Sequence, residues 1–419
     1  MKPSLEQPIF DLAIIGAGAA GLTTAIAAAR LAHDQKKAPN ILLLDSKPKV
    51  GAKILMSGGT RCNVTNASVQ PTDFEGGPKH FIKHVLEAFT PGQTIGWFKK
   101  LGVELILEPT GKYFPTTHSA KTVLEALLKE VDRLGVKLLT GTKITTLQKS
   151  GELFELKSDD PNFVVHSRTV VLTTGGLSHP GTGSDGTGYA LAKHFGHHII
   201  PTFPGLTPLL TDDADWKSLS GISLEVELSF YRSGKKEASA RGALLFTHFG
   251  FSGPAALDIS RHFASAEKEE QPEIKVNFLP AKNERALKIK TEKSIKNFLA
   301  QEFFLPSRFV DVFLKKIGLD GTASVESCSA EKSRLLGRSL FYYPLEVTGV
   351  YGYQKAEVTS GGVDLKEVKV QTMESKKSAG LYFAGEILDT DGRIGGFNFQ
   401  WAWSTGTIAG RGAARSLIA

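Results

Sequence analysis

The sequence predicts an α/β fold in two pieces, near the N-terminus and the C-terminus, separated by an insertion of different character. Near the N-terminus, an apolar strand at 12–15 leads into a glycine-rich turn and an alanine-rich helix. Near the C-terminus, another apolar strand at 381–384 again ends in glycine before a long helical stretch. Between them, residues 223–230 alternate apolar and polar side chains, which is typical of a strand with one buried face.

Composition limits the class of protein. The chain has 419 residues, of which 41% are hydrophobic and 22% are charged, as in soluble globular proteins with more than one core. The two cysteines, Cys62 and Cys328, have no further cysteine or close histidine at metal-ligand spacing. We therefore expect a cytoplasmic protein without a disulfide framework, a metal site or a membrane-spanning segment.

The charge balance permits an anionic partner. The net charge is +7, which suits RNA but is also common on proteins that bind no nucleic acid. The densest basic stretch, residues 282–297, holds six basic and two acidic side chains. We expect one solvated helix face there, with a phosphate-facing helix as the alternative.

The N-terminal turn has the spacing of a dinucleotide-binding motif. Gly16, Gly18 and Gly21 form a G-x-G-x-x-G pattern. In Rossmann-type folds the first glycine permits a tight turn, the second lets the backbone approach a pyrophosphate, and the third allows close helix–strand packing. A second apolar strand ends at Asp45, in the place of the carboxylate that binds an adenosine ribose. The sequence therefore predicts a dinucleotide site.

The segment after Asp45 favours FAD over NAD. An NAD dehydrogenase would continue with repeated βαβ units, whereas residues 47–66, KPKVGAKILMSGGTRCNVTN, are rich in glycine and polar residues and lack the period of a crossover helix. We expect a functional loop here.

The C-terminal strand supports the same cofactor. It ends in Gly385 and Glu386, and Gly395 and Gly396 precede the helical stretch. This arrangement resembles flavoproteins of the two-dinucleotide-fold type, which use such a strand, usually ending in Gly-Asp, to hold the ribityl chain and pyrophosphate. They aim the next helix at the flavin ring, where its N-terminus stabilises the anionic reduced flavin.

Two other strands are expected near the cofactor. The strand at 170–173 runs into Thr174, Gly175 and Gly176, where the backbone can pass close to the nucleotide or return toward the insertion. The segment GTKIT at 141–145, which contains Ile144, is expected to meet adenine at a strand edge.

Five motifs are spread in order over nearly the whole chain: GAKILMSGGTRCNVTN, LLFTHFGFSGPAAL, AEVTSGGVDL, TMESK and GLYFAGEILDTDGRIGGFNFQWAWSTG. Together they resemble the BaiN/RdsA family of FAD-dependent oxidoreductases, also described as YhiN-like or aminoacetone-oxidase-like flavoproteins. Thr60 and Phe397 stand where glycine and tyrosine are expected, and Thr60 would narrow access to the flavin.

The resemblance implies three parts. Residues 1–200 and 346–419 would form a Rossmann-like FAD domain of the two-dinucleotide-fold type. Residues 201–281 and 341–345 would form a β-rich, barrel-like insert, in which the alternating strand fits a hairpin. Residues 282–340 would form a helical subdomain.

The resemblance also implies the cofactor site. Small residues between 53 and 65 would let backbone N–H groups reach the flavin, while Arg61 supplies a fixed positive charge. The expected cofactor-binding residues are Gly16, Ala17, Gly18, Ala19, Ala20, Gly21, Asp45, Ser46, Lys47, Gly51, Lys53, Ser57, Gly58, Arg61, Cys62, Asn63, Thr65, Ile144, Thr174, Gly175, Gly176, Gly385, Glu386, Asp391, Gly395, Gly396, Phe397 and Asn398.

Two side chains are candidates for catalysis. Cys62 has no nearby base in the sequence, so we expect a cradle residue, with proton donation to a substrate carbon as the alternative. His248 is a candidate acid or base near the flavin, with a satisfied polar residue at a strand end as the alternative. Glu357, Thr359 and Glu374 are further candidates that fit exposed turns equally well.

The expected function follows from the cofactor and the resemblance. We expect an FAD-dependent oxidoreductase that uses NAD(P)H to reduce an activated C=C bond, because the family's members act on enone-type bonds of bile-acid-like steroids or on the uracil ring of ribosomal RNA. An amine oxidase that produces peroxide is one alternative. A non-catalytic flavin-containing RNA-binding or redox-sensing protein is another. The sequence leaves the substrate and the oligomeric state open.

Overall fold

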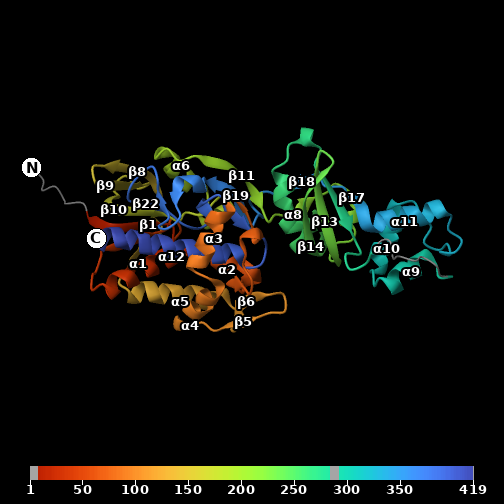
Figure 1. Cartoon of the computed structure of the whole chain (residues 1–419), viewed down its shortest axis with the longest axis horizontal. Helices are drawn as coiled ribbons and strands as arrows, with labels where there is room; N and C mark the ends of the chain where they lie inside the picture. Colours follow the sequence, from red (N-terminus) through yellow and green to blue (C-terminus); the bar gives the residue numbers. More distant parts are fainter. Residues whose placement is uncertain (1–7, 284–291, 419) are drawn as a thin grey trace, which may run out of the picture. The chain divides into compact units, whose positions relative to one another are not determined.

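The computed structural model describes residues 8–283 and 292–418 and divides into two compact units, which are coloured along the chain in Figure 1. Unit 1 is Met1–Thr202 with Val358–Ala419, and unit 2 is Phe203–Glu357. Unit 2 thus extends beyond the boundary at residue 346 expected from the sequence. The reason is that β18 (Gly349–Val350) pairs with β12 (Leu209–Leu210) in the sheet of unit 2.

A mainly parallel sheet forms the centre of unit 1, in the order β20-β21-β22-β10-β1-β2-β7. β1 (Ile9–Ile15) lies between β2 (Ile41–Leu44) and β10 (Val164–Leu172) and runs parallel to both. The centre of β1 is fully buried, as expected for a parallel sheet covered on both faces. The predicted Rossmann-like α/β fold is confirmed.

The other strands of unit 1 are β3 (Thr65–Asn66), β4 (Phe74–Gly76), β5 (Leu105–Leu107), β6 (Lys112–Pro115), β7 (Lys137–Leu139), β8 (Ile144–Ser150), β9 (Leu153–Ser158), β19 (Val358–Val363), β20 (Val368–Lys369), β21 (Glu374–Ser375), β22 (Leu381–Phe383) and β23 (Thr390–Gly392). β11 (Ile199–Gly205) leads into unit 2.

Two helices far apart in the sequence, α1 (Ala19–Asp34) and α12 (Phe397–Ile418), lie side by side (Figure 1). Glycine permits this approach. A methyl group added at Gly406 would lie 2.7 Å from Ala20 O, and one at Gly410 would lie 2.4 Å from Thr24 O. Since helix separation depends on the side chains at the contact, the two glycines allow the last helix of the chain to pack closely on the first. The other helices of unit 1 are α2 (Ala52–Thr60), α3 (Lys79–Ala88), α4 (Pro91–Lys100), α5 (Ala120–Arg133) and α6 (Thr187–His194).

The segment expected as a loop after Asp45 contains a short helix, so that expectation is wrong in part. α2 starts regularly, with Ile54 1% exposed, because its first residues are good helix formers. Regular geometry stops at Ser57, and Gly58 and Gly59 have φ values of +55° and +66°. Glycine takes this left-handed conformation at little steric cost, so the two glycines end the regular helix.

The sheet of unit 2 is antiparallel, in the order β17-β16-β13-β14-β15-β12-β18. β13 (Ser223–Arg232) and β14 (Lys235–Thr247) form the predicted hairpin. The barrel-like closure expected for this insert does not form, because the order ends at β17 and β18, and these two strands do not pair with each other within the described residues. β12 and β18 are each two residues long, too short to continue the ladder. The remaining elements of the sheet region are α7 (Ala214–Lys217), β15 (Gly250–Ser252), α8 (Pro254–Ala264), β16 (Glu273–Asn277) and β17 (Tyr343–Leu345).

Three helices occupy the region predicted to be helical: α9 (Ile295–Glu302), α10 (Ser307–Lys316) and α11 (Ala330–Tyr342). Half of the basic stretch expected as one helix, residues 284–291, lies outside the described residues. The described remainder becomes helical only from Ile295, after a cap in which Ser294 Oγ accepts a hydrogen bond from Asn297 N.

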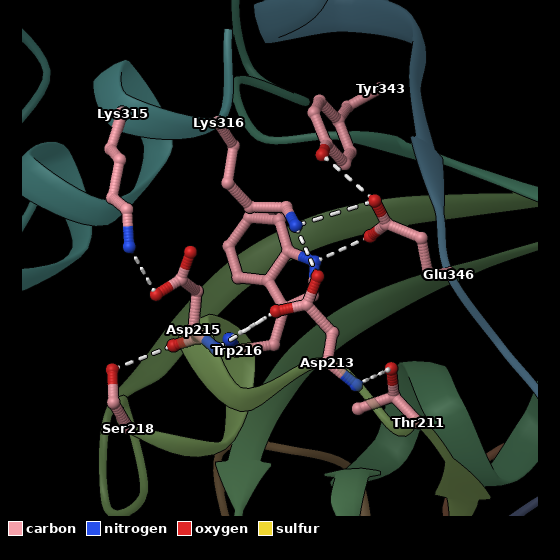
Figure 2. Close-up of polar contacts among 9 residues, drawn as sticks. All are labelled: Thr211, Asp213, Asp215, Trp216, Ser218, Lys315, Lys316, Tyr343 and Glu346. Atoms are coloured by element: carbon pink, nitrogen blue, oxygen red, sulfur yellow. Dashed lines mark hydrogen bonds and ion pairs between the residues drawn. The ribbon is translucent and has the colours of Figure 1, made fainter.

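An ion-pair cluster attaches α10 to its neighbours in unit 2, and Figure 2 shows Lys316 at its centre. The Lys316 ammonium contacts the carboxylate of Asp213 and lies 3.3 Å from Glu346 Oε1. Trp216 Nε1 donates a 2.7 Å hydrogen bond to Glu346 Oε2. Burial alone would lower the pKa of Lys316, but the two carboxylates raise it. The lysine therefore stays charged and holds α10 to the chain around α7 and after β17.

We expect Gly410→Ala to lower the free energy of unfolding by about 1–3 kcal/mol, because the added methyl group would overpack against the α1 backbone. The matched control is Gly96→Ala in α4, where no atom lies within 4 Å of an added methyl group. That change should raise stability by about 0.5–1 kcal/mol through helix propensity. Denaturant unfolding followed by circular dichroism compares the two variants, and equal effects would contradict the packing argument.

Candidate functional site

The glycine turn before α1 has the geometry that the sequence predicts. A methyl group at Gly16 would lie 2.5 Å from Thr173 O, and one at Gly21 would lie 1.8 Å from Gly16 O. At Gly18 there is no atom within 4 Å of an added methyl group. The outer two glycines are therefore required by packing within the protein, whereas Gly18 faces open space, as expected of a position that a phosphate approaches. Ala19 and Ala20 begin α1 directly after it.

Asp45 lies over this turn. Its carboxylate accepts hydrogen bonds of 2.8 Å from Ala17 N and from Lys47 N. Burial raises the pKa of Asp45, although these two backbone hydrogen bonds oppose the shift. A methyl group added at Gly183 would lie 2.9 Å from Ser46 Oγ, so the turn after β10 also meets this segment. The predicted acid, the glycine turn and the start of α1 thus form one hydrogen-bonded unit.

The segment after α2 is bonded to the start of α12. Asn66 Nδ2 donates to Gly395 O at 2.9 Å, and Thr65 Oγ1 donates to Gln400 Oε1 at 2.6 Å. Trp403 Nε1 donates to the carbonyl oxygen of Val64 at 2.9 Å. The structure therefore brings the two predicted flavin-side segments together. The sequence reasoning missed Asn66, Gln400 and Trp403, although all three stand inside its quoted motifs.

Three buried polar atoms have no hydrogen-bond partner among the described residues: Asn63 Oδ1, Thr174 Oγ1 and Ser360 Oγ. Leaving such an atom unsatisfied costs about 1–3 kcal/mol. Asn63 Oδ1 lies beside the start of α12, since a methyl group added at Gly396 would be 2.8 Å from it. A ligand that donates a hydrogen bond at this point would remove the cost, so the site fits a polar cofactor.

A charged network joins four separate segments of unit 1. Lys53 Nζ lies 2.6 Å from Glu386 Oε2 and 2.7 Å from Ser178 Oγ, and Ser178 Oγ donates to Glu386 Oε1 at 2.7 Å. Thr359 N donates to Glu386 Oε1 at 2.9 Å. Burial alone would raise the pKa of Glu386, but the Lys53 ammonium and these hydrogen bonds hold it below its ordinary value. Glu386 is therefore ionised at neutral pH.

The glycines after β10 belong to the same region. A methyl group at Gly176 would lie 2.4 Å from Thr359 Oγ1, and one at Gly175 would lie 2.6 Å from Ser184 Oγ and 3.9 Å from Glu386 Oε2. Sequence reasoning missed Ser178 because its partner, Glu386, is 208 positions away, and no local pattern relates the two.

Arg61 and Cys62 differ in their surroundings. Arg61 Nη1 lies 2.6 Å from Glu108 Oε1, and its guanidinium carbon is 4.0 Å from the centre of the Phe114 ring. Its charge is thus already paired within the protein. Cys62 is 0% exposed, and burial raises the pKa of its thiol to about 12 against a weaker opposing effect of Ser57. The thiol is neutral at physiological pH, so it is not poised as a nucleophile.

Several other predicted site residues have partners or packing inside unit 1. Gly51 packs on α5, since an added methyl group would lie 2.4 Å from Leu124 Cδ1. Ile144 is buried in β8, and Asp391 is buried in β23. Phe397 is fully buried, with its ring centre 6.2 Å from that of Phe74. Asn398 exchanges two 2.8 Å hydrogen bonds with the backbone of Gly392.

The remaining candidates for catalysis fall in both units. His248 and Glu357 belong to unit 2, where His248 has its ring centre 4.9 Å from that of Phe249. Glu374 and Thr359 belong to unit 1. Glu374 pairs with Lys369 at 2.7 Å, whereas Thr359 is fully buried in the network around Glu386. Thr359 N donates to Glu386, one of the predicted cofactor residues of unit 1.

We expect Lys53→Met to lower the free energy of unfolding by roughly 1–3 kcal/mol at neutral pH, because Glu386 would be left without its counter-charge. The side chains of Lys53 and Glu386 are only 26% and 21% exposed, so water screens the pair little. The pKa of Glu386 in the folded state lies below its ordinary value of 4.5. The ion pair therefore stabilises the folded state above pH 4.5, and this contribution is lost as the pH falls through the folded-state pKa. The difference between variant and wild type should therefore shrink below pH 4.5.

Denaturant unfolding at a series of pH values measures this difference. The matched control is Lys121→Met, which breaks an exposed pair with Glu125 at 3.5 Å and should change stability by no more than about 0.5 kcal/mol. A Lys53→Met deficit that is the same at every pH would argue against an ionised Glu386.

No three His, Cys, Asp or Glu side chains within residues 8–283 and 292–418 are grouped so that they could hold a metal ion. The described helices also include none with both the length and the apolar character needed to cross a membrane.

Comparison with known proteins places the chain among relatives of nearly equal length. Residues 10–412 match the HI0933-like protein Rossmann domain. A 3-dehydro-bile acid delta(4,6)-reductase from Clostridium scindens is 32% identical over 413 residues, which cover 96% of this chain and 98% of the relative. A ribosomal RNA dihydrouridine synthase from Haemophilus influenzae is 34% identical over 407 residues, which cover 94% and 95%.

Solved structures share the fold at low identity. The 3-ketosteroid-delta4-(5alpha)-dehydrogenase from Rhodococcus jostii RHA1 has a TM-score of 0.50 and 15% identity, and the match covers 98% of each chain. This likeness supports the fold alone. The family match and the two full-length relatives go further: the chain belongs to the HI0933-like family of Rossmann-domain proteins and is a flavoprotein oxidoreductase.

Proposed function

We propose that this oxidoreductase uses FAD to reduce a carbon–carbon double bond conjugated to a carbonyl group. The observation that carries the proposal is the pair of relatives. By their names, one reduces double bonds of a 3-dehydro-bile acid and the other converts uridine to dihydrouridine. These substrates differ in size and polarity, yet the reduced bond is conjugated to a carbonyl in both. We therefore infer the reacting group, a C=C bond conjugated to a carbonyl, from what the two substrates share.

FAD suits the residues that unit 1 brings together. We assign the pyrophosphate to the turn at 16–21 and the N-terminus of α1, the adenosine ribose to Asp45, and the ribityl side to Gly385 and Glu386. Asn63 Oδ1, which has no partner among the described residues, is suited to accept a hydrogen bond from a ring N–H of the flavin.

When bound, FAD supplies the two-electron redox chemistry of the reaction. The chain itself must orient the substrate, exclude water and provide the proton that the substrate carbon next to the carbonyl gains. Cys62 Sγ carries a proton at neutral pH because burial raises its pKa to about 12. Its full burial favours a packing role beside the flavin, with proton donation as the competing role. His248 remains a candidate acid or base on unit 2.

NAD(P)H is the proposed electron donor. The sequence has one G-x-G-x-x-G motif that joins a strand to a helix, at 16–21. The same spacing at 181–186 lies on a short 3-10 turn instead of following a strand, so we propose that the donor binds transiently rather than in a domain of its own. The proposed substrates are a small enone or the uracil ring of ribosomal RNA, and both suit a cytoplasmic enzyme.

We expect the purified protein to be yellow and anaerobic NADPH to remove its oxidised flavin absorption. A small cyclic enone should then restore the absorption without oxygen. Reduction by an amine alone, with peroxide formed in air, would replace this proposal with an amine oxidase. Mass analysis of uridines in ribosomal RNA, with and without the gene, distinguishes the two substrate classes.

We expect Cys62→Ser to keep its flavin and to retain turnover within about ten-fold, since a packing role predicts only a local change. A general acid contributes roughly 100- to 10,000-fold to a rate. Turnover reduced by such a factor, with flavin binding and flavin reduction intact, would instead establish Cys62 as the proton donor. Steady-state kinetics and single-turnover flavin reoxidation separate these outcomes.

A further inference from the structure

Residues 282–342 of unit 2 concentrate positive charge in the sequence. This segment contains 12 Lys and Arg residues against 7 Asp and Glu residues. The rest of unit 2 contains 9 basic and 13 acidic residues. The charge of unit 2 is therefore segregated along the sequence, with residues 282–342 positive and the rest of the unit negative.

One face of α11 carries exposed cationic and apolar side chains together. Arg334, Arg338 and Tyr342 are spaced four residues apart, and Leu335 lies beside them. All four are exposed, with Leu335 at 43% and Tyr342 at 49%. Positions four apart share one side of a helix, and Leu336 and Leu340 on the other side are buried. We call these four exposed residues the α11 stripe.

The C-terminal end of the stripe is held in place by the cluster in Figure 2. Tyr343, the residue after Tyr342, has its ring centre 5.5 Å from that of Trp216, and its hydroxyl donates to Glu346 Oε1 at 3.4 Å. Tyr343 is 7% exposed. Since Tyr343 is anchored inward where helix passes into strand, Tyr342 is presented outward from a fixed backbone.

The composition of the stripe fits a nucleic acid strand. Arginine binds phosphate through a planar fork of N–H donors, and an exposed tyrosine ring can stack on an unpaired base. Four residues of helix rise by about 6 Å, so Arg334, Arg338 and Tyr342 stand on successive turns of α11. Arg334 Nε also donates a 3.2 Å hydrogen bond to Ala330 O.

We propose that the α11 stripe is a docking surface for single-stranded RNA, with Arg334 and Arg338 on phosphates and Tyr342 stacked on a base. The choice of RNA rests on the proposed function, in which the uracil ring of ribosomal RNA is one substrate. The stripe binds the strand outside the reacting nucleotide, so it contributes affinity for RNA and nothing to the reduction of a small enone.

The test uses the full-length, FAD-loaded protein and a labelled single-stranded oligouridylate, with binding followed by fluorescence anisotropy over a range of KCl concentrations. Tyr342→Ala should weaken binding by roughly 5- to 100-fold, as loss of one stacked base predicts, and Tyr342→Phe should restore it. The double variant Arg334→Gln, Arg338→Gln should reduce the slope of log affinity against log salt by about 1.4, or 0.7 for each phosphate contact.

The matched control is the double variant Lys83→Gln, Lys121→Gln, which removes two exposed charges from helices of unit 1. It should leave the RNA affinity and the salt slope within about two-fold of wild type, because surface substitutions away from a binding site have small effects. Every variant should retain its flavin and reduce a small cyclic enone at the wild-type rate.

Three outcomes overturn the inference. In the first, the wild type reduces the enone but does not bind the oligouridylate at low salt. In the second, the stripe variants bind the oligouridylate as tightly as wild type. In the third, the stripe variants change self-association measured by light scattering and leave RNA affinity unaltered. Failure of NADPH to reduce the flavin would instead count against the proposed function, whatever the RNA measurement gives.

Discussion

The close contact between α1 and α12 is the constraint on which the organisation of unit 1 depends. The chain leaves unit 1 at residue 202 and returns at 358, and its last helix then packs on its first. Gly406 and Gly410 permit this, because any side chain there would meet the backbone of α1. The start of α12 is also bonded to the segment at 63–66, so the candidate site includes both.

In the candidate site, side chains and backbone of the chain itself hold the Glu386 carboxylate. Lys53, Ser178 and Thr359 hold the Glu386 carboxylate by hydrogen bonds from three different segments. Holding a partly buried charge costs free energy of desolvation, which the ion pair with Lys53 offsets. In contrast, Asn63 Oδ1 is left without a partner in the described part of the chain. A ligand that donates a hydrogen bond to Asn63 would satisfy this amide oxygen, as a polar cofactor can.

Unit 2 consists of an open antiparallel sheet with helices attached to it. Its two shortest strands lie at one end of the sheet order, where the barrel-like closure expected from the sequence fails. The helices are joined to the sheet region by aromatic packing around Trp216 and by the charge of Lys316 between two carboxylates. The outer side of α11 exposes Arg334, Arg338 and Tyr342.

The sequence alone determined the Rossmann-like fold, the glycine turn, Asp45 and the hairpin of unit 2. These depend on local spacing and on the period of apolar residues, which a chain carries without its tertiary contacts. It missed the helix in the segment after Asp45, because a short helix broken by Gly58 and Gly59 has no full period to detect. Tertiary structure alone decided that Glu386 is held by Lys53 and Ser178, that Arg61 is paired with Glu108, and that Cys62 is buried. Each of these depends on residues brought together from distant parts of the chain or on packing from several elements, and neither leaves a local pattern in the sequence.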